Sequence, residues 1–102
     1  MKHPRHQLEE SLNSPVRFSI VAALNTVDEA EFAVVRDAVE VSDSVLSKHV
    51  ATLERARLVA VRKGYVGKRP RTWLRLTKDG RRTFASHVAA LRAIADGAAG
   101  PT

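Results

Sequence analysis

The sequence predicts an α+β fold in which three helices precede a two-stranded β-hairpin and a fourth helix follows it. Apolar residues recur at helical spacing before Arg57 and again near the end of the chain, whereas the pattern between these parts is extended. The charge changes at the same place: residues 1–54 hold five Lys/Arg and nine Asp/Glu, and residues 55–82 hold eleven Lys/Arg and one Asp. A basic hairpin attached to helices is therefore the central feature of the predicted fold.

The length and composition are those of a single domain that spans residues 1–102. We expect flexible ends at residues 1–7 and 97–102. No apolar run approaches the roughly 20 residues that cross a bilayer, and the polar N-terminus lacks the apolar core of a signal peptide, so a cytoplasmic location is expected. The absence of cysteine excludes disulfides, thiolate metal sites and a cysteine nucleophile.

The first helix is predicted to begin at Pro15, after a short helical lead-in over residues 7–12. Ser14 is a suitable N-cap, and Pro15 suits the first helical position because its missing N–H needs no partner there. Ile20 and Leu24 recur on one apolar face, which we expect to lie against the core.

A second helix is predicted over residues 28–40, with Asp28 and Glu31 spaced as a capping box. A third is predicted over residues 43–56, with Ser42 as its N-cap. Two short helices joined by so tight a turn cannot lie antiparallel, so they must cross steeply. This is the geometry of a helix-turn-helix.

The third helix separates into a buried and an exposed face. Leu46, Val50 and Leu53 lie at i, i+4 and i+7 and form the buried stripe. The opposite face holds small, hydroxyl-bearing and cationic side chains, which suit close approach to base edges in a major groove. The alternative is an ordinary solvated helix face. The expected DNA contacts of this helix and its cap are Ser42, Ser44, Val45, Ser47, Lys48, Thr52 and Arg55.

After the third helix, residues 58–63 and 73–76 are predicted as strands, joined by a long loop over residues 64–71. Trp73 is expected in the core. A packed hairpin has no structural need for so many cations, whereas a cationic wing over residues 62–72 would bind phosphates or a narrow minor groove. The alternative is a flexible, solvated loop. The expected DNA contacts of the wing are Arg62, Lys63, Lys68, Arg69 and Arg71.

Thr77 is predicted to cap a final helix with an apolar face. A chain of this size has limited core with which to cover that face and the apolar residues of the lead-in, which favours a symmetric dimer. The alternative is that these residues complete the core of a monomer. The expected interface residues are Leu8, Leu12, Phe84, Val88, Leu91 and Ile94.

Segment 41–54 has the sequence VSDSVLSKHVATLE and is followed by Leu58-Val59. It resembles the recognition helix of winged helix-turn-helix regulators of the MarR and ArsR groups. In these groups a serine-rich start, a Ser-Lys/Arg-His-Leu-like centre and a Leu-Glu end lead into the first wing strand. GKRPRT at 67–72 and LTKDGR at 76–81 resemble the wing and the start of the final helix in a short subgroup. The resemblance covers about residues 12–95.

The resemblance implies a winged helix-turn-helix fold and a homodimer that binds double-stranded DNA. In these groups glycine commonly stands where the recognition helix gives way to the strand, and here that position holds Arg57. A non-glycine residue in a left-handed cap costs roughly 1 kcal/mol, so we expect this helix to end differently. The chain also has less helix than full-length MarR proteins, which leaves little room for a comparable ligand crevice.

The sequence thus predicts a sequence-specific, double-stranded DNA-binding transcriptional regulator, a homodimeric repressor with a near-palindromic operator. The alternative is a winged-helix module that binds protein or RNA. No nucleophile–base pair, glycine-rich phosphate loop or paired carboxylates indicate an enzyme, and no cofactor is expected. The four histidines lack metal-ligand spacing and are interpreted as structural: His3, His6, His49 and His87.

Overall fold

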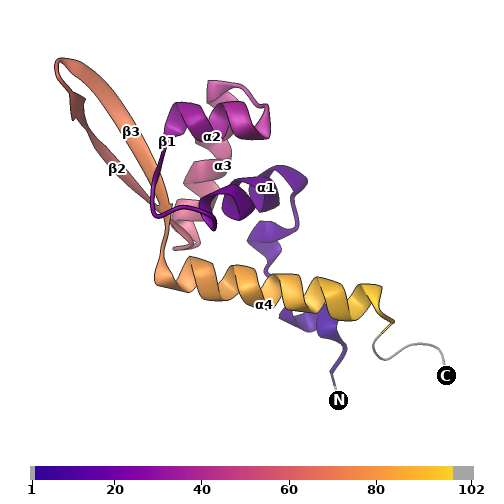
Figure 1. Cartoon of the computed structure of the whole chain (residues 1–102). Coiled ribbons are helices and arrows are strands. Elements are labelled where there is room, and N and C mark those ends of the chain that lie inside the picture. Colours follow the sequence, from indigo (N-terminus) through magenta and orange to yellow (C-terminus); the bar gives the residue numbers. More distant parts are fainter. Residues whose placement is uncertain (1, 98–102) are drawn as a thin grey trace.

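The computed structural model describes residues 2–97 of the chain (Figure 1). The hairpin projects from a group of helices, and the last helix runs along the opposite side, as the predicted order of helices and hairpin requires. In chain order the elements are η1 (Pro4–Gln7), η2 (Glu10–Leu12), α1 (Pro15–Leu24), β1 (Ala30–Glu31), α2 (Phe32–Val39), α3 (Asp43–Arg55), β2 (Val59–Val66), β3 (Arg69–Leu76) and α4 (Lys78–Ala95). None of these helices is long and apolar enough to span a membrane.

The core lies between α1, α3 and one face of the sheet. Ile20 and Leu24 of α1, Leu46 and Leu53 of α3, and Leu74 of β3 belong to one cluster and have 0% exposed surface. The predicted apolar stripes of the first and third helices are thus confirmed. Burial of one such side chain contributes roughly 1.5–3 kcal/mol, so this cluster fixes α3 firmly against the sheet.

Three of the predicted N-caps are also confirmed. Ser14, Ser42 and Thr77 each accept a hydrogen bond from the backbone N–H three residues later, at 3.2, 3.2 and 2.8 Å. Each hydroxyl satisfies a donor that the helix itself leaves without a partner. The starts of α1, α3 and α4 are therefore set by local sequence.

The predicted second helix begins too early. Ala30 and Glu31 form the short strand β1, which pairs antiparallel with Leu74 and Trp73 of β3. Helix α2 starts only after this strand and has no side-chain cap, so the predicted capping box at Asp28 is wrong. Pairing with β3 satisfies backbone groups on both strands, which a helix cap could not do. The sheet has three strands in the order β1-β3-β2 instead of the predicted two.

The long loop predicted over residues 64–71 is also wrong. Strands β2 and β3 continue to Val66 and Arg69, which pair directly across a two-residue turn. Gly67, the first turn residue, has φ +63°. A positive φ at the first turn residue but not at the second, Lys68, is the pattern of a type II′ turn, which matches the twist of the strands it joins. The wing is therefore a regular hairpin rather than a loose loop.

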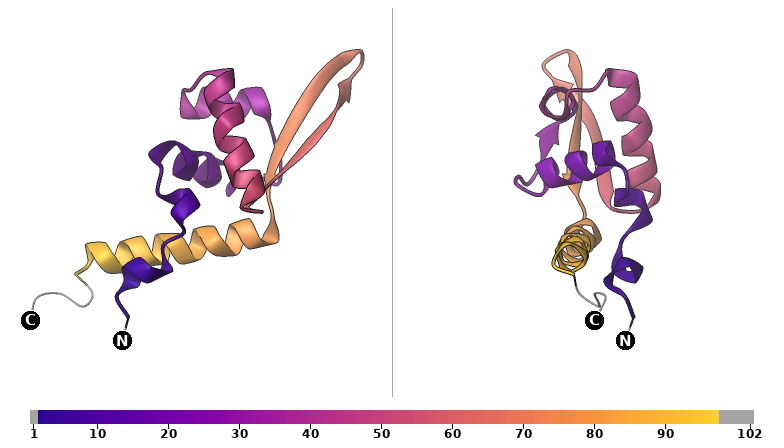
Figure 2. Two further views of the ribbon diagram at one scale, coloured as in Figure 1. Left: turned by 180° about the vertical axis from the view of Figure 1, so that it is seen from behind. Right: turned by 90° about the vertical axis from the view of Figure 1, so that its right-hand side faces the viewer.

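The described chain is elongated. Its principal extents are 63 × 24 × 21 Å and its radius of gyration is 15.5 Å, whereas a compact chain of this length has about 13 Å. The hairpin and the far end of α4 both project from the core (Figures 1 and 2). Residues 4–7, expected to be flexible, form η1 beside α4. Of the other expected flexible end, residues 98–102 lie outside the described residues.

His87 of α4 joins this helix to the N-terminal segment. Its Nδ1 accepts a hydrogen bond from the backbone N–H of Glu9 at 3.0 Å, and its ring lies against Phe18 with centroids 5.7 Å apart. Burial lowers the pKa of His87, which favours the neutral ring that this hydrogen bond requires. The lead-in and α4 are therefore coupled through one buried side chain.

The first turn of α4 rests on the backbone between α3 and β2. A Cβ added to Gly80 would overlap the carbonyl oxygen of Leu58 and lie 3.0 Å from its carbonyl carbon. The backbone N–H of Thr77 donates to the same oxygen at 3.0 Å. Glycine thus permits the close approach that sets the position of α4 relative to the sheet.

Gly80→Ala is expected to lower the free energy of unfolding by about 1–3 kcal/mol, because a backbone overlap cannot be relieved by rotating a side chain. This loss should outweigh the gain of about 1 kcal/mol in helix propensity. Urea unfolding followed by circular dichroism measures the change. Ser86→Ala, at an exposed position of the same helix, is the control and should change stability by under about 0.5 kcal/mol. Equal unfolding midpoints for both variants would contradict the close approach.

Candidate nucleic-acid interface

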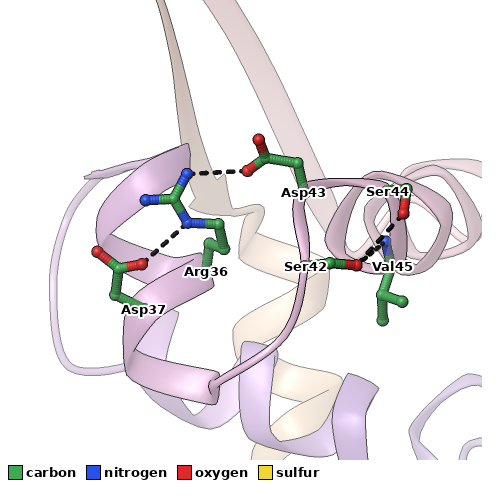
Figure 3. A network of polar contacts seen from close by, with 6 residues as sticks. All are labelled: Arg36, Asp37, Ser42, Asp43, Ser44 and Val45. Atoms are coloured by element: carbon green, nitrogen blue, oxygen red, sulfur yellow. Dashed lines mark hydrogen bonds and ion pairs between the residues drawn. The ribbon is translucent and has the colours of Figure 1, made fainter.

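Helices α2 and α3 form the predicted helix-turn-helix and are tied together by Arg36. Its Nη1 donates to Oδ1 of Asp43, in the first turn of α3, and its Nε donates to Oδ1 of Asp37, both at 2.9 Å (Figure 3). The same guanidinium lowers the pKa of Asp37. Arg36 therefore neutralises a carboxylate at the start of α3 and fixes that end of the helix.

The predicted contact residues of α3 lie on its exposed side, but not all are free. Ser42 is engaged in the N-cap and also lies 3.2 Å from the hydroxyl of Ser44. Thr52 is half-buried, donates to the carbonyl of Lys48 at 3.3 Å and accepts from Arg55 at 3.3 Å. Among the predicted contact residues of α3, Val45, Ser47 and Lys48 have exposed side chains that make no hydrogen bond to the described part of the chain.

His49, also on α3, points back toward α1. Its Nδ1 lies 3.2 Å from Nη1 of Arg17, whose Nε donates to the carbonyl of Ser11 at 2.6 Å. Burial lowers the pKa of His49, and the charges of Arg17 and Lys48 lower it further. The neutral ring thus serves as an internal partner of Arg17 and takes no part in the exposed face.

Helix α3 ends in the manner that glycine normally allows, although Arg57 occupies the position. Arg57 has φ +64°. Its N–H donates to the carbonyl of Glu54 at 2.9 Å, and the N–H of Leu58 donates to the carbonyl of Leu53 at 3.0 Å. These two bonds define a Schellman motif. The expectation that this helix ends differently is therefore wrong, because the motif forms with the strained residue in place.

The wing cations divide between the two faces of the hairpin. Lys63 pairs with Thr72 on the face that also holds Val61 and Leu74, and this face turns toward α3. The alternate positions form the outer face. They include three of the five predicted wing contacts: Arg62, Arg69 and Arg71. Lys68 lies in the turn itself.

A cleft of about 500 Å³ separates α3 from the inner face of the wing. Its floor is apolar, with Val50 of α3 and Val61 of β2 among the lining residues. Its rim is polar and includes Ser47, Glu54 and Lys63. The helix and the wing thus form two walls of one cleft, and the left view of Figure 2 shows the hairpin leaning away from the helices.

Arg62 is not a free cation. Its Nε and Nη2 donate to the two carboxylate oxygens of Glu29 at 3.1 and 2.7 Å, and its guanidinium carbon lies 4.0 Å from the ring centroid of Trp73. The hydrogen bond from Arg62 lowers the pKa of Glu29. Trp73 is half-buried on the outer face of the sheet, so its predicted place in the core is wrong.

Three polar residues of this region are absent from the predicted set. Arg36 carries no motif that distinguishes it from any other helical arginine. Glu29 and Glu31 were assigned to the start of a helix, which hid their position beside the wing. Arg62 and Lys63 are consecutive residues of one strand, and this was the available sign that the cations lie on both faces.

The residues predicted for a dimer interface differ in how deeply they are buried within the single chain. Leu12 is 2% exposed and belongs to the core, so its assignment to an interface is wrong. Phe84 packs on Phe18 with ring centroids 5.5 Å apart and is also partly core. The rest of the predicted set keeps exposed surface: Leu8, Val88, Leu91 and Ile94.

A family model described as a winged helix DNA-binding domain matches residues 16–95. The chain belongs to this family. The match extends from α1 to the end of α4 and includes the helix-turn-helix and the whole wing. The family predicted from the recognition-helix and wing segments is therefore confirmed.

Solved structures with the same fold are transcriptional regulators of the MarR family. The transcriptional regulator homologue of Pyrococcus horikoshii has a TM-score of 0.85 and 28% identity to this winged helix protein, and the match covers 95% of this chain and 97% of that one. The regulator MosR of M. tuberculosis, solved in complex with DNA, has a TM-score of 0.70 and 20% identity and covers 90% of this chain and 65% of its own. That identity shows a shared fold only.

A relative of known sequence is an uncharacterized protein of Methanocaldococcus jannaschii. It is 29% identical over 76 residues, which make up 74% of this chain and 83% of that protein. The match thus covers most of the length of both chains.

Arg57→Gly is expected to raise the free energy of unfolding by about 0.5–1 kcal/mol, because glycine adopts positive φ without the strain that arginine bears. Thermal or urea unfolding measures the change. Arg55→Gly, two residues earlier inside the helix, is the matched control and should lower stability by about 1 kcal/mol. A loss of stability in both variants would contradict this expectation. It would show that the Arg57 side chain stabilises the fold by more than the backbone strain at its positive φ costs.

Proposed function

We propose that this winged helix protein binds double-stranded DNA in a sequence-specific manner, with α3 in the major groove and the wing on the backbone or in the adjacent minor groove. The observation that carries the proposal is the shared concave surface. One flank of α3, which includes Ser47, and the inner face of the basic hairpin, which includes Lys63, line one cleft, and a duplex presents a groove and its bordering phosphates together.

The contact residues proposed for α3 and the wing divide by chemistry, and among them Ser47 and Lys63 line the cleft itself. Lys48, Lys63, Lys68 and Arg69 are exposed cations, and neutralising phosphates with them would release counterions and supply most of the affinity. Ser44, Val45 and Ser47 lie near the start of α3, where a recognition helix meets base edges. We assign base recognition to these three residues, and a thymine methyl is the natural partner of Val45.

We further propose that the protein acts as a homodimer joined through α4 and the N-terminal segment. The far end of α4 projects beyond the core, and Leu91 on it is 38% exposed. Leu8 and Ile94 keep exposed surface as well. A two-fold dimer would place two α3 helices about 34 Å apart, one turn of DNA, and would require a near-palindromic operator. Occupancy of such a site would block promoter access, the action of a repressor.

Lys48→Ala and Arg69→Ala are each expected to weaken duplex binding and to reduce the magnitude of the salt slope by about 1, since each removes one phosphate contact. Ser44→Ala and Val45→Ala should instead change the preferred base sequence. Fluorescence anisotropy titrations over a range of salt concentrations measure both effects. Arg92→Ala, exposed on α4 away from the cleft, is the charge-matched control and should leave both unchanged.

Two results of these titrations would contradict the proposed function. One is equal affinity of the wild-type protein for duplex DNA, single strands and RNA at physiological salt. That outcome would favour the alternative of an RNA- or protein-binding module. The other is a uniform loss of affinity in all four variants, which would remove the assignment of base recognition to the start of α3.

Leu91→Glu is expected to convert the dimer to a monomer without unfolding it, because the side chain is partly exposed in the single chain but would face its symmetry mate in the dimer. Analytical ultracentrifugation measures the mass, and circular dichroism checks the fold. Val34→Glu is the control, since Val34 is 59% exposed on α2, outside the proposed contact. A wild-type protein that sediments as a monomer at micromolar concentration would contradict the proposed dimer.

A further inference from the structure

The outer part of the wing has little backbone support. Strand β1 pairs with β3 only at Leu74 and Trp73. From Lys63 to Thr72 the hairpin consists of two strands alone, and a two-stranded hairpin is only marginally stable by itself. We call residues 63–72 the free wing. Its direction must therefore be set by side chains at its base.

Two carboxylates occupy that base on the outer face. Glu31 of β1 stands directly opposite Trp73, and Trp73 stands opposite Arg62, so the three side chains form one row across the sheet. Both carboxylate oxygens of Glu29 accept hydrogen bonds from the guanidinium of Arg62. Glu31 lies 3.8 Å from Nε of Arg71, two residues along β3. The segment before α2 thus contacts both strands of the wing.

The Glu29–Arg62 contact is the stronger of the two ion pairs. A two-point contact between a guanidinium and a carboxylate fixes orientation as well as distance. Arg62 is held in addition by the ring of Trp73, whose edge lies 3.2 Å from the position that a Cβ on Gly64 would occupy. Carboxylate, guanidinium, indole and backbone therefore form one layer at the base of the free wing.

We propose that Glu29 and Glu31 are positioning residues for DNA binding, which hold Arg62 and Arg71 and thereby fix the direction of the free wing. Arg62 and Arg71 then act mainly in this anchor, and phosphate contacts come from Lys63, Lys68 and Arg69. The effect on DNA rests on the proposed function. The effect on the wing itself does not.

The direction in which DNA affinity changes when the two carboxylates are neutralised separates an anchoring role from a purely electrostatic one. Removing a negative charge beside a basic wing should strengthen the binding of a polyanion. Loss of an anchor should weaken it, because the free wing must then be ordered again on binding. Glu29→Gln together with Glu31→Gln is therefore expected to weaken duplex binding by about threefold to tenfold, although the net charge becomes more positive.

The test measures wing order and DNA affinity separately. Backbone ¹⁵N relaxation of the free wing in the DNA-free protein should show lower order parameters in the double variant. Emission of Trp73, the one tryptophan of the chain, should change as Arg62 leaves its ring. Asp28→Asn is the matched control: Asp28 is exposed and adjacent to Glu29, and its replacement should leave wing order unchanged.

A charge exchange supplies the rescue. Glu29→Arg combined with Arg62→Glu keeps the net charge and the ion pair, and should recover wing order and part of the lost affinity. A phosphate contact by Arg62 would instead make this variant bind worse than the Gln variants, which would overturn the anchor role of Arg62.

Each remaining outcome is also decisive. Unchanged wing order in the double variant would overturn the proposal whatever the DNA affinity. Lower order with stronger DNA binding would show that the carboxylates act on DNA only by their charge. If the wild-type protein binds no duplex, the proposed function fails, and the order parameters still decide whether Glu29 and Glu31 hold the wing.

Discussion

The structure depends on the pairing of β3 with both of its neighbours at Leu74 and Trp73. Because side chains alternate along a strand, these adjacent residues serve opposite faces. Leu74 has no exposed surface and joins the sheet to the helices, whereas Trp73 lies between Glu31 and Arg62 on the outside. One short stretch of sheet therefore seats α3 on one side and anchors the wing on the other.

This constraint explains how so small a chain presents a large binding surface. Helix α3 is held at its start by Arg36, along its length by Leu46 and Leu53, and at its end by the turn at Arg57. The exposed side chains of Ser47 and Lys48 make no side-chain hydrogen bond to the described part of the chain. The outer part of the wing is held together by the pairing of β2 with β3. The cleft between α3 and the wing follows because both are attached to the same part of the sheet. Stability is concentrated in the core, and the proposed recognition surface projects from it.

Features set by neighbouring residues were predictable from the sequence, and features set by distant ones were not. The caps at Ser42 and Thr77 depend on a few adjacent residues, and the apolar stripes depend on helical period. Strand β1 depends on β3, far along the chain, so Glu29 and Glu31 were assigned to a helix start. Arg57 was recognised as unusual, but the strength of the surrounding turn could not be judged from its identity. The cations of the wing were evident from the charge pattern, while their division between two faces required the strand register.

Two copies of this surface are proposed to recognise one DNA site together. Selection of bound sequences from a random duplex pool tests it most directly. We expect a near-palindromic consensus whose half-sites are centred about 10 base pairs, or a multiple of that, apart. A selection that yields no consensus, or a single half-site without symmetry, would contradict it.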